Sequence, residues 1–501
     1  MTKKDSKRQK GDPPEEPESE EIKVNGLSPG SVLYLSLVVK LFYYVVCFAL
    51  NSPTFDKNHD QNIFEENYNP NKYWLVNRLS FLVNWDGLYF LNTATDEYSN
   101  LKQFAFFPGW PTLVKVIHAV GRKYIPFYTS LLDEYKLDAF MVILLGTGIN
   151  LFLHLFNTRL IMTLAHLKGM TRLSIIRIGL LFAVSGPSLY HVVFYSESLY
   201  LSLVLFGLCL VEQVYRANAT FSQVSWVRHV ITITLMGFAG AVRSVGFLNA
   251  AYIGYPLLLE LFYTIRNKKL QNRFLNAFEA VMRSIAVVFA FVFPIVILFM
   301  YTRKLFCHPP AKDDPGYRQP GFCETPYGNY YSFIQEAYWN VKFMGLWRSG
   351  NKEVYLLLLN TIPVISYYYI NFFKKNRVVD ILRLNYSVVG TDSLNLNDPR
   401  LRAFPDFIMM LIFTKTFYLE AHPNSVERFL SAYPQYYFMM DQYQTYLTPQ
   451  HVEGDKDQGE KPQPLVGKRA VLFCLRNLVF VNVVWRLIAT PLLFVTNIHP
   501  I

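Results

Sequence analysis

The hydrophobic positions of this 501-residue chain gather into long, solid runs separated by polar stretches. Several of these runs approach the roughly 20 apolar residues that an α-helix needs to cross the hydrocarbon core of a bilayer. Helices are the expected spanning elements, because open strands leave backbone groups unpaired in lipid and barrel strands alternate between apolar and polar residues. The pattern therefore predicts an all-α, polytopic transmembrane bundle with about eight to eleven spans.

Short basic stretches between the runs predict the topology, because Lys and Arg favour the cytoplasmic side. The first span begins at Val32, leaves the N-terminus in the cytoplasm, and alternate crossings follow. We expect the spans or apolar segments at 32–50, 138–164, 174–190, 199–214, 237–247, the run before 266–273, 284–302, 354–373, 403–419 and 470–495. The stretch FLSAYPQYYFMM is either a short span or an interfacial helix.

The polar segments define the domain organisation. Residues 1–29 have few aromatics and should form a disordered cytoplasmic tail. Residues 30–501 should form a single membrane-embedded domain, with one lumenal loop at 51–137 and a second at 303–352. Within the first loop, the apolar piece Pro111 to Val120 is too short to span and contains Lys115, so we expect it to be interfacial or re-entrant.

Composition agrees with a membrane protein. Hydrophobic residues make up 52% of the chain, aromatic residues 16% and charged residues only 17%, which excludes a typical soluble globular protein. The formal net charge is +11, but the basic residues lie in short segments between apolar runs. This distribution indicates membrane topology and argues against nucleic acid as a partner.

The five cysteines divide into two groups. Cys47, Cys209 and Cys474 lie inside apolar runs, where cysteine usually acts as a small buried hydrophobe. Cys307 and Cys323 flank a polar, Pro-rich loop, and we expect them to form a disulfide in an oxidising compartment. No CxxC pair and no HExxH motif occurs, so the sequence predicts no metal site and no cofactor.

The segment Arg78 to Pro111 contains the first candidate for catalysis. Asp86 follows Trp85 in an amphipathic stretch, and a carboxylate beside an indole and apolar neighbours is poorly solvated when charged. That environment suits a general base. The alternative is structural: Asp86 could cap a helix or pair with Arg78.

Two further ionisable residues lie at expected ends of spans on the same membrane face. Glu197 stands between two serines at the start of an apolar run, where it could act as a base, contact an acceptor or simply cap the helix. Arg243 follows the small-residue run GFAGAV, and its guanidinium could hold a phosphate in a bidentate manner. The alternative role for Arg243 is a salt bridge to Asp86 or Glu197.

The aromatic block FAFFPGWP is rigid and apolar. Phe106, Phe107 and Pro108, together with Trp85, could lie beside an isoprenoid chain at the headgroup level. Packing within the protein is the other explanation. Lys40 lies near the middle of the first span, where a charge is costly, so it should face the bundle interior or snorkel to the interface.

The strings FLVNWDGLYF, FAFFPGWP, YSESLY and AVRSVGFLNA occur in that order, followed by CETPYGNYYSFIQEAYWNVKFMGLWR and RFLSAYPQYY. This ordered set resembles the PIG-V family, GPI mannosyltransferase 2, from about residue 30 to the C-terminus. The segment SGPSLYH departs from the Cys-Asn-Pro type that the family more often has before the YSESLY turn. The role of His191 is therefore open.

The resemblance implies a GT-C class glycosyltransferase of the endoplasmic reticulum membrane. Such an enzyme would transfer the second mannose, α1,6-linked, from dolichyl-phosphate mannose to the glycosylphosphatidylinositol (GPI) precursor on the lumenal face. Its partners would be these two lipids and the membrane, and whether it needs a small membrane partner subunit stays open. In this interpretation Asp86 is the base, Arg243 steadies the phosphate and Glu197 is the reserve candidate.

Other function classes share this composition. A polytopic lipid transporter would show repeat symmetry, and no internal repeat is visible in the sequence. A lumenal mannosyltransferase with another acceptor, or a non-catalytic subunit, is also compatible with the chain. Two N-glycosylation sequons begin at Asn218 and Asn385, and the expected topology leaves both in the cytoplasm and unmodified.

Overall fold

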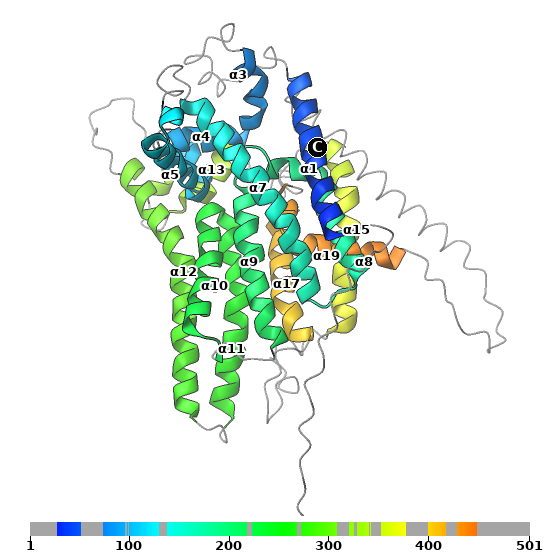
Figure 1. Cartoon of the computed structure of the whole chain (residues 1–501). Helices are drawn as coiled ribbons and strands as arrows, with labels where there is room; N and C mark the ends of the chain where they lie inside the picture. The colour runs from blue at the N-terminus through cyan, green and yellow to red at the C-terminus, as the bar shows by residue number, and fades with distance from the viewer. Residues whose placement is uncertain are drawn as a thin grey trace, which may run out of the picture.

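A computed structural model describes the chain over residues 28–51, 74–95, 98, 100–129, 138–217, 223–267, 272–307, 320–324, 328–339, 341, 352–376, 399–416 and 428–447. These residues form α-helices and short 3-10 helices, and no strand occurs among them. Figure 1 shows the long helices packed side by side, with several short helices gathered at one end of the molecule. The predicted all-α architecture is confirmed.

Five helical segments in the described part are long and apolar enough to cross a membrane. They are α1 (Pro29–Leu50), α7 (Asp138–Leu167), α9 (Glu197–Arg216), the joined η5 and α11 (Ser244–Arg266), and α12 (Arg273–Cys307). The shorter α10 (Trp226–Val242) is also apolar. These helices follow the apolar runs of the sequence, as expected for polytopic membrane proteins. The tail 1–27, the run 470–495 and both sequons lie outside the described residues.

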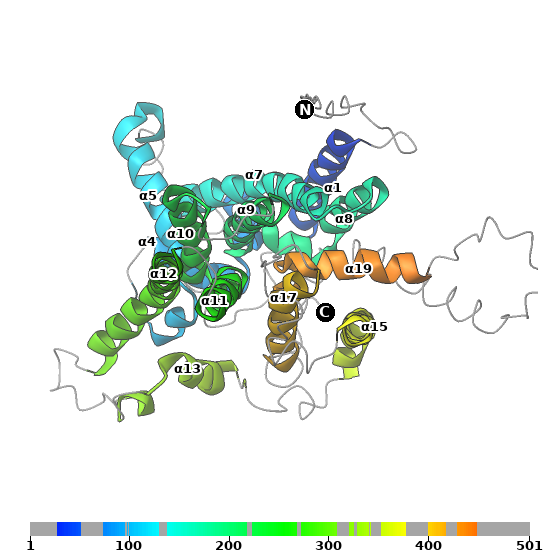
Figure 2. The same cartoon turned by 90° about the horizontal axis from the view of Figure 1, so that it is seen from below.

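Helices α15 (Lys352–Lys375), α17 (Pro399–Thr414) and α19 (Pro434–Leu447) cover the later runs. Seen from below, α19 lies between α8 and α15 (Figure 2). Helix α15 packs against α19 through Tyr367 and against α17 through Phe372. The stretch FLSAYPQYYFMM therefore ends inside a helix that is too short to span.

The expected span at 174–190 was wrong in its length. Helix α8 (Arg172–Val184) ends after 13 residues, and the 3-10 helix η3 (Gly186–His191) follows. The reason is local, because Pro187 disfavours the α conformation at the residue before it. The break turns the chain toward the buried segment that leads into α9.

Lys40 faces the interior of the bundle. Its side chain is fully buried, and its Nζ donates hydrogen bonds to the carbonyl of Ala183, at 2.9 Å, and to the Ser188 hydroxyl. Both acceptors lie at the end of α8 or in η3. The charged residue that is most costly in the first span therefore ties α1 to the break after α8.

Small residues bring helices into close contact, as the run GFAGAV predicted. A Cβ atom added at Gly237 would lie 2.7 Å from the Ala290 carbonyl oxygen, so any larger side chain would separate α10 from α12. On the opposite side, α12 exposes a row of apolar side chains, including Phe274, Val288, Phe289 and Met300. An exposed apolar face of this length is suited to lipid.

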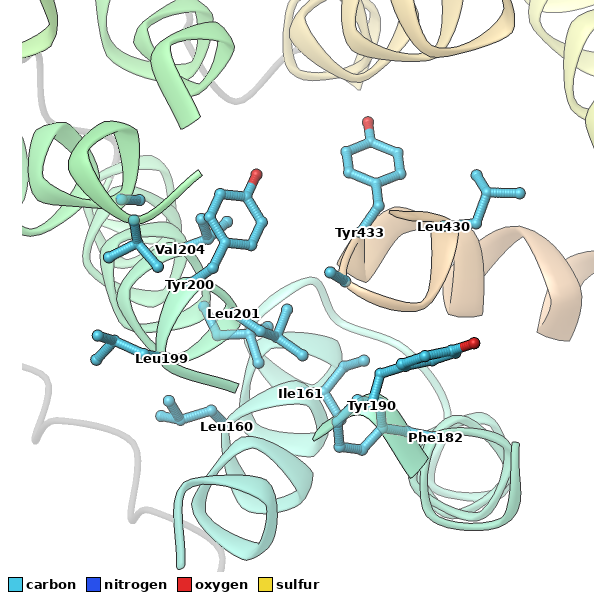
Figure 3. Close-up of a cluster of buried hydrophobic side chains, with 14 of the residues drawn as sticks. Leu160, Ile161, Phe182, Tyr190, Leu199, Tyr200, Leu201, Val204, Leu430 and Tyr433 are labelled. Carbon is cyan, nitrogen blue, oxygen red and sulfur yellow. The ribbon is translucent and has the colours of Figure 1, made fainter. Parts of the chain in front are cut away.

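The main hydrophobic core joins segments that are distant in the chain. Leu160 and Ile161 of α7, Leu201 and Val204 of α9, and Leu430 and Tyr433 near α19 belong to one cluster of buried residues (Figure 3). Consequently the segment around residue 430 packs directly on the helices at the centre of the bundle.

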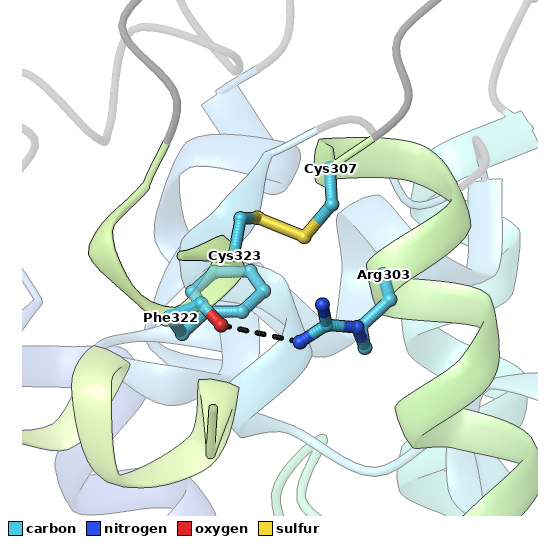
Figure 4. Close-up of a disulfide and its surroundings, with 4 residues drawn as sticks. All are labelled: Arg303, Cys307, Phe322 and Cys323. Atoms are coloured by element: carbon cyan, nitrogen blue, oxygen red, sulfur yellow. Dashed lines mark hydrogen bonds between the residues drawn. A yellow bond between two sulfur atoms is a disulfide. The ribbon is translucent and has the colours of Figure 1, made fainter. Parts of the chain in front are cut away.

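The short helices η1 (Ser80–Val83), α4 (Asp86–Thr95), η2 (Leu101–Ala105), α5 (Gly109–Tyr124) and α13 (Tyr330–Trp339) come from the two polar segments. A second buried cluster joins η2 and α13 to the end of α12, with Phe104, Phe107, Leu298, Cys307, Phe322, Tyr330 and Ile334 as members. Cys307 and Cys323 form a disulfide there, with Cα atoms 5.4 Å apart (Figure 4). Arg303 donates to the Phe322 carbonyl beside it, at 3.2 Å.

Candidate active site

Asp86, Glu197 and Arg243 meet around a fourth residue, Arg428. The Nη1 of Arg428 donates to Oδ2 of Asp86, and its Nε donates to Oε1 of Glu197. Arg243 lies on the other side, with its Nη1 2.5 Å from the same Oε1 of Glu197. We call these four residues the carboxylate–arginine cluster. Its two carboxylates and two guanidiniums balance in charge, which is the condition under which ionised groups tolerate burial.

Asp86 is the first residue of α4, and the turn before it directs its side chain. Trp85 has a φ of 62°, in the left-handed region that residues with a side chain rarely adopt. The Tyr195 hydroxyl donates to the Asn84 carbonyl at 2.6 Å, and the Phe194 amide donates to the Leu82 carbonyl at 2.9 Å. The turn is therefore fixed against the segment that precedes Glu197, and an unusual backbone conformation of this kind marks functional sites.

Glu197 begins α9 and is completely buried. Two amides of α7 fix the approach to it: Asn150 donates to the carbonyls of Val193 and Tyr195, and Asn157 donates to the Ser198 carbonyl at 2.9 Å. The carboxylate therefore lies at the positive end of a helix and also contacts two guanidiniums. The partners of this carboxylate are the two guanidiniums, and no side-chain capping hydrogen bond begins α9.

The two arginines pack against different aromatic side chains. Arg243 is the C-terminal cap residue of α10, and its guanidinium lies over the Phe429 ring, at 4.4 Å from the ring centroid. Its neighbour Ser244 hydrogen bonds the Tyr331 hydroxyl of α13 at 2.9 Å. Arg428 instead lies over the ring of Tyr195, at 4.6 Å. Both guanidiniums are thus supported by aromatic faces, a geometry that Arg favours.

His191 holds the backbone of Arg428 through a serine. Its Nε2 is 3.2 Å from the Ser431 hydroxyl, and that hydroxyl donates to the Arg428 carbonyl at 2.7 Å. Burial lowers the pKa of His191 to about 3, so the ring is neutral at physiological pH. His191, whose role the sequence left open, therefore helps to position the backbone of Arg428 through Ser431.

The aromatic block packs within the protein. The ring of Phe106 stacks on Tyr89 with centroids 4.9 Å apart, and Phe107 is buried against Tyr331 at 6.1 Å. Pro108 precedes α5 as its N-terminal cap residue. Trp85 is half-buried beside Asp86. Packing explains the positions of Phe107 and Pro108, while Phe106 and Trp85 keep part of their surface exposed.

The structure shows which partner each of the charged candidates contacts. Arg243 forms the salt bridge to Glu197, and Asp86 pairs with Arg428. Arg78 donates instead to the carbonyls of Ala49 and Asn51. Within the described ranges, no group of three or more His, Cys, Asp or Glu residues could hold a metal ion.

Sequence reasoning missed Arg428. It opens the string RFLSAYPQYY, which carried part of the family resemblance, but a single Arg after a polar stretch has no spacing that indicates a site. The only available signal was its position in that string. The residue joins the cluster through contacts that span 342 residues to Asp86 and 231 residues to Glu197.

Comparison with known proteins identifies the family. Residues 31–499 match the family model described as mannosyltransferase (PIG-V). The chain belongs to the PIG-V mannosyltransferase family. All four members of the carboxylate–arginine cluster lie inside the matched range.

Several curated proteins are similar to this PIG-V family chain. GPI mannosyltransferase 2 of Aspergillus oryzae is 27% identical over 277 residues, which cover 55% of this chain and 56% of that protein. GPI mannosyltransferase 2 of Candida albicans is 22% identical over 405 residues, covering 78% and 92%. Human GPI alpha-1,6-mannosyltransferase 2 is 24% identical over 282 residues, covering 53% and 52%. The chain thus spans little more than half the length of two of these relatives. No solved structure matches it.

Proposed function

We propose that this chain transfers a mannose from dolichyl-phosphate mannose to the GPI precursor, adding the second mannose in α1,6 linkage on the lumenal side of the endoplasmic reticulum membrane. The observation that carries the proposal is the carboxylate–arginine cluster, which joins Asp86, Glu197 and Arg243 in one site. Membership of the PIG-V family supports the sugar and the transfer. The names of the Candida albicans and human relatives support the GPI acceptor.

The chemistry needs one base and a cation for the leaving group. Asp86 is the base, because its side chain is 26% exposed, whereas Glu197 is completely buried. The acceptor hydroxyl gives its proton to Asp86 while its oxygen attacks C1 of the mannose. The bond from C1 to the phosphate oxygen breaks, and attack from the opposite face converts the β-linked donor to an α-mannoside. Dolichyl phosphate leaves as a stabilised anion, so no general acid is required.

Glu197 and Arg243 form the inner pair of the site. Glu197 holds both guanidiniums in position, and Arg243 adds positive potential behind the phosphate. Trp85 and the exposed part of Phe106 line the side on which the polyprenyl chain lies. Phe107 and Pro108 act by supporting Phe106 and the start of α5.

The disulfide supports a lumenal site. Cys307 and Cys323 belong to the same buried cluster as Tyr330, and the next residue, Tyr331, bonds Ser244 beside Arg243. A disulfide persists in an oxidising compartment such as the lumen. In this proposal residues 30–501 are a single membrane domain, with lumenal loops at 51–137 and 303–352.

The test is complementation in cells that lack their own second GPI mannosyltransferase. The unmodified chain should restore display of GPI-anchored proteins, and Asp86→Asn at equal expression should not. The matched control is Asp138→Asn, which removes a carboxylate from an exposed pair with Arg122 at 3.4 Å, away from the cluster. Equal restoration by Asp86→Asn would show that Asp86 is structural, and Glu197 would become the base to test. Mannose transfer to a different lipid acceptor in membranes would contradict the GPI assignment.

A further inference from the structure

We propose that Arg428 binds the phosphate of the polyprenyl-phosphate donor and that the phosphate takes the place of Asp86 on its guanidinium. In the donor-free site, Arg428 holds the base. Arrival of the donor then releases Asp86 for the acceptor hydroxyl. The inference deepens the proposed function and rests on it.

The guanidinium of Arg428 is only partly used by its present partners. Its Nε and Nη1 donate to Glu197 and Asp86, whereas no described residue accepts a hydrogen bond from Nη2. Its side chain is 13% exposed, compared with 6% for Arg243. Arg428 is therefore the more exposed of the two arginines, and its Nη1 and Nη2 form the edge of the fork that can bind two phosphate oxygens.

The two carboxylates hold Arg428 unequally. Glu197 is completely buried at the start of α9 and is shared with Arg243, so its contact with Nε anchors the guanidinium. Asp86 is the most exposed member of the cluster, at 26%, and it holds the outer nitrogen, Nη1. An incoming anion would therefore compete with Asp86 and leave the Glu197 contact intact.

Replacement of Asp86 by the donor phosphate on Arg428 would free the base at the step that needs it. An acceptor hydroxyl must reach the carboxylate of Asp86 directly, and Arg428 occupies its Oδ2 in the present arrangement. When a phosphodiester takes Nη1 and Nη2, Asp86 loses that partner, and its Oδ2 becomes free to accept a hydrogen bond from the acceptor hydroxyl. The base is thus released only when the phosphate of the leaving group is already in contact with Arg428. Donor binding before acceptor binding follows from this order.

The inference predicts a gain of affinity in an inactive variant. Full-length protein in detergent is titrated with citronellyl phosphate, a short polyprenyl phosphate. Asp86→Asn removes the competitor for Nη1, so the variant should bind the probe more tightly, by roughly fivefold, which is the factor that a partly exposed ion pair is worth. Arg428→Gln should weaken binding by at least about tenfold. The double variant Asp86→Asn/Arg428→Gln should show no gain over Arg428→Gln, and the control Asp138→Asn should bind as the unmodified chain does.

Unchanged or weaker binding by Asp86→Asn would overturn the exchange. Arg428→Lys guards against a folding artefact, because it keeps the charge but lacks the fork. A folded Arg428→Lys variant, checked by thermal unfolding, should still bind several-fold more weakly, and full affinity would overturn the bidentate contact. Glycerophosphoinositol is the second probe: if its binding and not that of citronellyl phosphate responds to Asp86→Asn, the phosphate belongs to the acceptor. These titrations need no GPI precursor, so they can succeed even where complementation fails.

Discussion

Arg428 forms a hydrogen-bonded ion pair with Asp86, although 342 residues separate the two in the sequence. The contact joins the turn that begins α4 to the segment that precedes α19, and Glu197 completes it from the start of α9. Three segments that are remote in sequence therefore share one guanidinium. The effects of substitutions at these residues should therefore be coupled and not simply additive.

Glu197→Gln should reduce stability more than Asp86→Asn does. The amide keeps the size of Glu197 but leaves two guanidiniums without their shared counter-charge, and removal of one partner from a buried ion pair costs about 3–5 kcal/mol. Asp86 is partly exposed, so solvent replaces much of what Arg428 loses there. Thermal unfolding in detergent measures the difference, and equal losses in the two variants would contradict the ranking of burial.

Tyr331→Phe should reduce mannose transfer while leaving the protein folded. The change removes only the hydroxyl that bonds Ser244 at 2.9 Å, and the ring keeps its contact with Phe107. Loss of one such bond costs about 1 kcal/mol, close to a fivefold change in rate. Ser244→Ala and the double variant should lose no more than the single variant, because all three break one bond. Additive losses, measured as kcat/KM, would show that the two hydroxyls act separately.

Loss of the disulfide should lower the stability of the α13 region. Cys307 and Cys323 close a loop of 16 residues in sequence separation, and a loop of that size is stabilised by about 3 kcal/mol. Reductant should lower the unfolding temperature of the unmodified chain but should leave that of Cys307→Ala/Cys323→Ala unchanged. An effect of reductant on the double variant would assign the sensitivity to another cysteine.

His191 should make stability depend on pH below neutrality. Its pKa in the folded protein is lowered to about 3 by burial, whereas an unperturbed His titrates near pH 6.5. The unfolded chain therefore binds more protons between these values, so the stabilising contribution is complete above about pH 6.5 and is lost as the pH falls toward 3. The slope for one group approaches about 1.4 kcal/mol per pH unit. His191→Gln should show a shallower decline in unfolding temperature from pH 7 to 5, and an identical decline would exclude His191 as the source.

The local sequence predicted the spanning helices, several site residues and the disulfide of this protein. Apolar runs predicted α1, α7, α9 and α12, because helix formation across a membrane depends on the hydrophobicity of one continuous segment. Charged residues at the ends of such runs are costly in lipid, which singled out Glu197 and Arg243, and the apolar neighbours of Asp86 singled out that carboxylate. The polar loop between Cys307 and Cys323 predicted the disulfide that joins them.

Only the tertiary structure decided which of these residues lie together and that the guanidinium of Arg428 connects them. Arg428 has no local signal, since its partners lie 231 and 342 residues away and are brought to it only by helix packing. The same packing directs Lys40 inward onto the break after α8 and buries Phe107 against Tyr331. A sequence pattern reports the cost of exposing a side chain to lipid, but the partner that offsets that cost is a property of the folded bundle.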